Sequence, residues 1–185
     1  MRILLKTILV AAFCGSATAW ATAPDDFNVL MHQAWEAQLA NDPVFASQLG
    51  DRRYNDRWAD QSIEAINAAQ AQQRDFLRRV YAIDRSALAA NDQLNYELFR
   101  RELQYTVDEF QFNGYLLPFS HRGGVQNLES NTTGLSFESV QDYDDWLTRM
   151  SGIGNVIDQT SAICRCSLTQ TGSGSSASTR TRSQR

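Results

Sequence analysis

The 185 residues carry a formal net charge of −4, and 43% of them are hydrophobic, which suits one globular domain. The charge is unevenly spread, because residues 24–160 hold all 21 Asp and Glu residues against 11 arginines, a formal charge of −10. Such an acidic segment argues against nucleic acid and anionic membrane surfaces as partners.

Residues 1–23 have the layout of a secretory signal peptide. A basic start at Arg2 and Lys6 precedes a short apolar run and small-residue Ala-x-Ala patterns. The apolar run is too short to span a bilayer, so we expect no membrane anchor. The patterns predict cleavage after Ala19 or Ala21, and therefore a periplasmic or secreted protein.

The rest of the chain is predicted to be helical nearly throughout, up to Thr160. Apolar residues recur at three- and four-residue spacing over residues 27–39, 63–80, 96–110 and 140–150, which is typical of amphipathic helices. No segment alternates convincingly enough to predict a strand. The fold class is therefore all-α, an irregular array of about five helices.

Helix starts are marked by polar side chains. Asp42 followed by Pro43 predicts a short second helix that ends at Gly50, Ser62 predicts the cap of a long third helix, and Asn91 predicts the cap of the next. Between these helices, residues 51–61 form a polar, aromatic connector, and residues 114–134 are predicted to form a loop.

The composition changes abruptly after Thr160. Residues 161–185 contain no Asp, Glu, Lys, Pro, Val or aromatic residue, and 11 of these 25 positions are Ser or Thr. A segment this polar buries too little apolar surface to offset its ordering entropy, so disorder is predicted. Two origins stay open: a natural low-complexity linker, or a non-native sequence produced by a slipped reading frame.

Side chains for metal chemistry are scarce. The histidines are His32 and His121, whereas a catalytic zinc site takes three protein ligands, commonly with a His pair on one helix. Cys164 and Cys166 form a Cys-x-Cys pair without further ligands, and the three cysteines make no disulfide framework. We therefore assign no metal ligand, cofactor or catalytic residue to this chain.

Several blocks of sequence resemble one family. They are, in order, Trp35-Glu36, Asp42-Pro43, Leu49-Gly50-Asp51-Arg52-Arg53-Tyr54-Asn55-Asp56-Arg57-Trp58, Asp92-Gln93-Leu94-Asn95-Tyr96, Arg122-Gly123-Gly124, Phe137-Glu138-Ser139-Val140 and Asp142-Tyr143-Asp144-Asp145-Trp146-Leu147. Over residues 27–160 the chain resembles the N-terminal part of the bacterial domain-of-unknown-function 885 family.

The resemblance implies an exported, mostly helical zinc peptidase whose metal-binding motif, a His-Glu followed by a Pro-Gly-His, lies far downstream in a chain several times longer. It implies zinc and a peptide substrate for that full-length protein. Residues 24–160 are then expected to be the incomplete N-terminal part of a larger α-helical peptidase-like domain, truncated before the catalytic region and inactive. The alternative is a small exported helical binding module without enzymatic activity, with residues 161–185 as a genuine linker.

Two segments are candidates for the substrate side of the parent protein, namely the connector and a glycine-containing loop that allows close approach of a ligand. The candidate residues are Arg52, Arg53, Tyr54, His121, Arg122, Gly123 and Gly124. The structural alternative for the connector is a network that ties helices together and joins Arg52, Arg53 and Arg57 to Asp51, Asp56 and Asp60. Apolar faces shaped for absent elements also predict self-association.

Overall fold

The computed structural model describes residues 22–120, 124–126, 128, 135 and 137–179, with side chains up to residue 168. The described residues are mainly helical and include no strand, which confirms the all-α class. The α-helices are α1 (Ala23–Asn41), α2 (Pro43–Gln48), α3 (Ile63–Tyr81), α4 (Ala90–Glu109), α5 (Val140–Ser151) and α6 (Ile153–Thr179). Short 3-10 turns are η1 (Arg52–Tyr54), η2 (Arg85–Ala87), η3 (Phe110–Phe112) and η4 (Gly114–Leu116).

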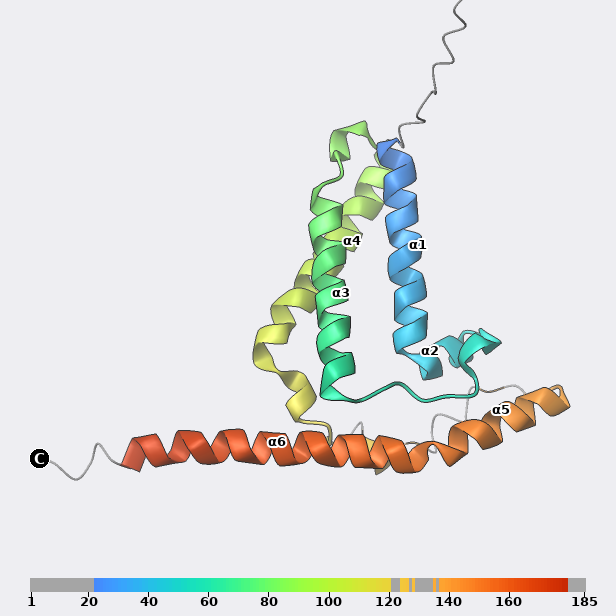
Figure 1. Ribbon diagram of the computed structural model, residues 1–185. Coiled ribbons are helices and arrows are strands. Elements are labelled where there is room, and N and C mark those ends of the chain that lie inside the picture. The colour runs from blue at the N-terminus through green and yellow to red at the C-terminus, as the bar shows by residue number, and fades with distance from the viewer. Residues whose placement is uncertain (1–21, 121–123, 127, 129–134, 136, 180–185) are drawn as a thin grey trace, which may run out of the picture.

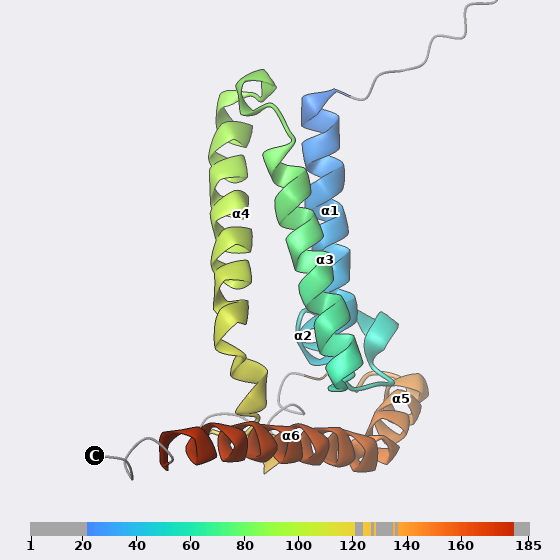
Figure 2. The same ribbon diagram turned by 60° about the vertical axis from the view of Figure 1, so that its left-hand side comes forward.

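Helices α1, α3 and α4 stand side by side and enclose the main core (Figures 1 and 2). The buried side chains of this core are Phe27, Leu30, Phe76, Val80, Leu88, Tyr96 and Leu103. The ring centroid of Phe27 lies 5.9 Å from that of Tyr96 and 6.2 Å from that of Phe99. Aromatic pairs at such separations add to the free energy gained from burial alone. The apolar spacing of α1, α3 and α4 is therefore the spacing of a packed core.

Two of the three predicted caps are present. Asp42 accepts a hydrogen bond from the backbone N–H of Phe45 at 3.0 Å, and Ser62 accepts one from Ala65 at 3.2 Å. The prediction for Asn91 is wrong, because α4 begins at Ala90 and Asn91 lies inside its first turn. Gln93 donates to the Leu88 carbonyl at 2.9 Å, and this bond secures the helix start in place of a capping side chain.

Helix α6 lies across one end of the three-helix bundle, where it contacts η4 (Figures 1 and 2). It continues from Ile153 to Thr179, whereas the composition predicts disorder from Ser161 onward. Val156, Thr160 and Ile163 recur at four- and three-residue spacing and are buried, so one face of the helix continues past the change in composition. The buried Ile163 supplies an apolar anchor that the average composition of residues 161–185 conceals.

Helix α5 turns its apolar side toward solvent and its polar side toward the rest of the molecule. The apolar stripe of this helix consists of Val140, Tyr143, Leu147 and Met150, and all four side chains are exposed. Its buried residues are Asp142 and Arg149. An amphipathic helix at a protein surface ordinarily turns its apolar side inward. The polar side of α5 therefore faces the connector and α2, while Tyr143 of the apolar stripe packs against Phe137, with ring centroids 5.0 Å apart.

The predicted signal peptide lies outside the described residues except for Thr22 and Ala23, and residues 180–185 also lie outside them. Among the described helices, none combines the length and the apolar character that a membrane span requires.

Candidate functional site

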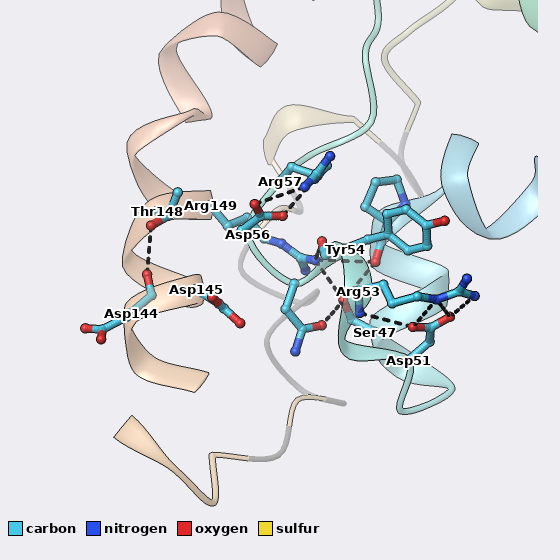
Figure 3. A network of polar contacts seen from close by, with 12 residues as sticks. Ser47, Asp51, Arg53, Tyr54, Asp56, Arg57, Asp144, Asp145, Thr148 and Arg149 are labelled. Atoms are coloured by element: carbon cyan, nitrogen blue, oxygen red, sulfur yellow. Dashed lines mark hydrogen bonds and ion pairs between the residues drawn. The ribbon is translucent and has the colours of Figure 1, made fainter. Parts of the chain in front are cut away.

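The connector of residues 51–61 joins α2 to α3 and also touches α5, about 90 residues further along the chain (Figure 3). We call the contact between this connector, α2 and α5 the Arg149 junction. It contains three of the candidate residues, Arg52, Arg53 and Tyr54, all of which lie on η1.

Arg53 holds η1 against α1. Its guanidinium pairs with Glu36 through Nη1 at 2.6 Å and with Asp51 through Nη2, also at 2.6 Å. The hydrogen bonds from Arg53 are the main reason why the pKa values of Glu36 and Asp51 lie below their ordinary range. Both carboxylates are thus committed to one arginine and remain ionised, so neither is suited to act as a general base at neutral pH.

Arg52 reaches in the other direction, to the start of α5. Its Nη2 lies 3.0 Å from Oδ2 of Asp142 and 3.6 Å from Oε2 of Glu138. Asp142 is buried and accepts hydrogen bonds from the backbone N–H of Ser139 and of Glu138, at 2.8 and 3.0 Å, which completes a capping box. Burial alone raises the pKa of Asp142, but the hydrogen bond from the Ser139 hydroxyl, these backbone bonds and the charge of Arg52 bring it below its usual value.

Arg149 is the centre of the junction and is fully buried. Its Nη2 donates to the hydroxyl of Ser47 and to the backbone carbonyl of Tyr54, each at 2.7 Å, and more weakly to the carbonyl of Pro43 at 3.3 Å (Figure 3). The ring of Trp58 covers the guanidinium, with its centroid 5.6 Å from Cζ. Trp58 also donates from Nε1 to the Arg149 carbonyl at 2.6 Å.

All the hydrogen-bond acceptors that Arg149 uses among the described residues are uncharged. Burial lowers its pKa, while the charges of Asp56 and Asp145 act in the opposite direction. Nε and Nη1 are buried and have no hydrogen-bond partner within the described part of the chain. A buried cation without a close counter-ion is costly. Arg149 is held in place by hydrogen bonds to uncharged acceptors rather than by an ion pair.

A cavity of about 280 Å³ lies beside the junction, between the connector and the α5–α6 bend. Its walls include the carboxylates of Asp56 and Asp60. Asp56 pairs with the neighbouring Arg57 at 2.7 Å, and Asp60 accepts from the N–H of Ser62 and from Gln159, each at 2.8 Å. These partners lower the pKa of both carboxylates, which makes them poor proton acceptors at neutral pH.

The second candidate segment is only partly described. His121, Arg122 and Gly123 lie outside the described residues, and Gly124 lines a separate cavity of about 400 Å³ next to η4 and α6. That cavity is not lined by Arg52, Arg53 or Tyr54. Gly124 has a φ of 139°, a conformation that strongly favours glycine. The structure therefore places the described members of the two candidate segments at different sites.

No group of three or more His, Cys, Asp and Glu residues within the described residues could hold a metal ion. His32 is exposed on α1, and Cys164 and Cys166 lie half-buried on α6. The family resemblance places its zinc-binding motif downstream of these residues, and we assign no chemical step to a metal here.

The sequence did not single out Arg149. One signal was available, because Asp142 and Arg149 are seven residues apart on a predicted helix and therefore lie on the same face. That face also carries Trp146, whose ring lies 6.4 Å from the ring of Trp58. A helix face that combines charged residues with a tryptophan was an indication that α5 packs through its charged side.

The arginine network of the connector differs from its predicted form. Arg53–Asp51 and Arg57–Asp56 pairs are present, but Arg52 pairs with Asp142 and Glu138. Asp60 forms hydrogen bonds with Ser62 and Gln159 in place of an arginine. The network joins α1, η1 and α5, so it does tie helices together.

Comparison with known proteins gives a family match. The family model described as bacterial protein of unknown function (DUF885) matches residues 43–176, which include the connector, α5 and most of α6. No curated protein and no solved structure matches. Since the family model covers well over half of the sequence, the chain belongs to the bacterial DUF885 family.

Proposed function

We propose that this chain is the helical, non-catalytic N-terminal part of an exported, zinc-peptidase-like protein of its family. The observation that carries the proposal is the Arg149 junction, which lies inside the family match. Arg52 and Arg53 use their guanidinium groups to bind carboxylates of the same chain, and the Tyr54 carbonyl accepts from Arg149. These residues hold η1 against α1 and against α5, which supports a structural role for the connector rather than substrate binding.

Peptide hydrolysis is proposed for the longer parent protein, where zinc would activate water and polarise the peptide carbonyl. The family resemblance places the metal-binding motif downstream of this region. Within the described residues, the carboxylates that line the cavity beside Arg149 have structural partners. The proposed contribution of this chain is therefore to hold helices in place around a site built elsewhere.

The first test measures zinc content and peptidase activity of the purified mature chain. We expect no stoichiometric zinc by elemental analysis and no cleavage of a fluorogenic peptide library above a heat-denatured sample. One zinc per chain, lost in either His32→Ala or His121→Ala, contradicts the proposal. His32 lies on the exposed side of α1, so its replacement leaves the described core intact.

Export and the identity of the parent need separate measurements. Mass spectrometry of the periplasmic fraction should find a mature N-terminus at Trp20 or Thr22, and a cytoplasmic product that retains residues 1–23 rules out export. For the parent protein, the DNA that follows the coding region should encode the His-Glu and Pro-Gly-His motif in another reading frame. An unrelated downstream sequence removes the support for a slipped frame.

A second candidate function is a self-sufficient helical binding module, which the outward apolar stripe of α5 favours. Burial of a Leu or Phe side chain contributes roughly 1.5–3 kcal/mol, against a net domain stability of about 5–15 kcal/mol. A fragment with several such side chains uncovered should therefore unfold broadly and bind an apolar dye. A sharp, cooperative transition of a monomer, well above body temperature, supports the module and contradicts the fragment.

A further inference from the structure

The exposed stripe of α5 is an apolar surface on a helix whose polar side is buried. Val140, Tyr143, Leu147 and Met150 follow one another at intervals of three, four and three residues, which is the seam spacing of a two-helix coiled coil. The helix lies at the edge of the molecule, away from the three-helix bundle (Figure 1). Four contiguous apolar side chains on one helix face indicate a contact surface rather than scattered surface residues.

The spacing of the stripe makes it complementary to itself. In an antiparallel pair of α5 helices, Val140 of one copy lies level with Met150 of the other, and Tyr143 lies level with Leu147. Both pairs share residue 145 as their midpoint, so one register matches all four positions at once. Each level then combines a smaller side chain with a longer or larger one, which suits interdigitation.

We infer that a second copy of this chain packs antiparallel against the exposed face of α5 and forms a two-fold symmetric dimer. Symmetric homodimers use the same patch on both subunits, which a self-complementary stripe provides. The antiparallel arrangement also brings the positive end of each helix dipole near the negative end of its partner. The inference concerns association only and does not depend on the reaction proposed above.

The charged residues at the edge of the stripe predict how the dimer responds to salt. Asp144 points away from the connector, whereas Arg149 points toward it (Figure 3). Asp144 flanks the stripe one residue from the two-fold axis, so it lies near its own copy across the interface. Two like charges at such a position weaken association, and salt screens their repulsion. The dimer should therefore become tighter as the salt concentration rises.

The size of the stripe sets the expected strength. A contact built on four side chains of one helix falls at the small end of interface areas, below about 1,200 Å² in total. We therefore expect a transient dimer with a Kd on the order of 100 µM. Such an affinity is measurable by sedimentation equilibrium of the mature chain.

The test replaces one leucine inside the stripe and one outside it. Leu147 and Leu98 are matched, since their exposed fractions are 66% and 60% and both lie on helices. Leu147→Asp should weaken dimerisation at least about 100-fold, because each dimer loses two buried leucines and gains two buried carboxylates. Leu98→Asp on α4 should leave the Kd unchanged. Asp144→Asn should tighten the wild-type dimer about threefold and reduce its salt dependence.

Circular dichroism of each variant verifies that the monomer is folded. The inference is overturned if the wild-type chain stays monomeric up to about 1 mM, a range that covers even weak specific contacts. It is also overturned if Leu98→Asp weakens association as much as Leu147→Asp, because association then does not depend on the face of α5. Unchanged salt dependence in Asp144→Asn contradicts the antiparallel register.

Discussion

Two substitutions of Arg149 compare the free energy that its hydrogen bonds contribute with the free-energy cost of burying its charge. In Arg149→Ala, the Tyr54 carbonyl loses the donor at 2.7 Å and a cavity opens under Trp58. An unsatisfied buried carbonyl costs about 1–3 kcal/mol, and truncation of a large buried side chain costs a similar amount again. We expect Arg149→Ala to lower the free energy of unfolding by about 3–5 kcal/mol.

Arg149→Met should destabilise the fold less than Arg149→Ala. The methionine side chain fills most of the space under Trp58 and carries no charge into the interior. It still leaves the Tyr54 carbonyl without its donor, but it removes the several kcal/mol that burial of a guanidinium costs. Nε and Nη1, which have no partner among the described residues, no longer need one. We expect Arg149→Met to lie within about 1.5 kcal/mol of the wild-type stability.

Urea unfolding of both variants measures the difference. Tryptophan fluorescence reports on the junction, because the rings of Trp58 and Trp146 lie 6.4 Å apart there, and circular dichroism reports on total helix. Arg101→Met, on the exposed side of α4, is the control and should change the stability by less than about 0.5 kcal/mol. If Arg149→Met is as unstable as Arg149→Ala, the bonds of the guanidinium outweigh its burial cost and the reasoning fails.

Three further predictions concern single contacts. The pKa of Asp142 is lowered in the folded chain. The stability that its ionised form contributes is therefore complete above the ordinary value of 3.8 and is lost as the pH falls through the folded pKa. Urea unfolding midpoints across this pH range should depend less on pH in Asp142→Asn than in the wild type. Ser62→Ala should cost about 1 kcal/mol by urea unfolding because it removes a cap, whereas Asn91→Ala should be nearly neutral, and equal losses would contradict the assigned start of α4. Phe27→Ala should cost about 3–5 kcal/mol in thermal unfolding because the ring is fully buried, and a loss below about 1 kcal/mol would show that the bundle is loosely packed.

The bundle could be predicted from the sequence because its signals are local. Ser62 and Asp42 cap the helices that follow them, and each cap is a contact over three residues. The stripe that contains Tyr96 and Leu103 points inward because α1 and α3 offer matching apolar faces. Asn91 misled because a good capping residue inside the first turn looks the same in the sequence as one at the cap.

The orientation of α5 could not be predicted, because it depends on contacts across about 100 residues. Periodicity places Leu147 on a face to be buried, but it does not say which partner buries that face. The bond between Arg149 and Ser47 decides the orientation, and neither residue indicates the other in the sequence. Likewise, Ile163 stays buried on α6 within a stretch whose average composition predicts disorder. The average composition of a segment hardly changes when one apolar residue lies where a helix can bury it.

The separation of Arg149 from its acceptors also determines the order in which the chain can fold as it emerges N-terminus first. Ser47 and Tyr54 emerge about 100 residues before Arg149, so the α1–α4 bundle can complete its core while their polar groups are still hydrated. Docking of α5 must then close a loop of that length and displace the water from these groups in one late step. The emerging chain therefore gains its apolar core early, and only the finished chain excludes water from the junction.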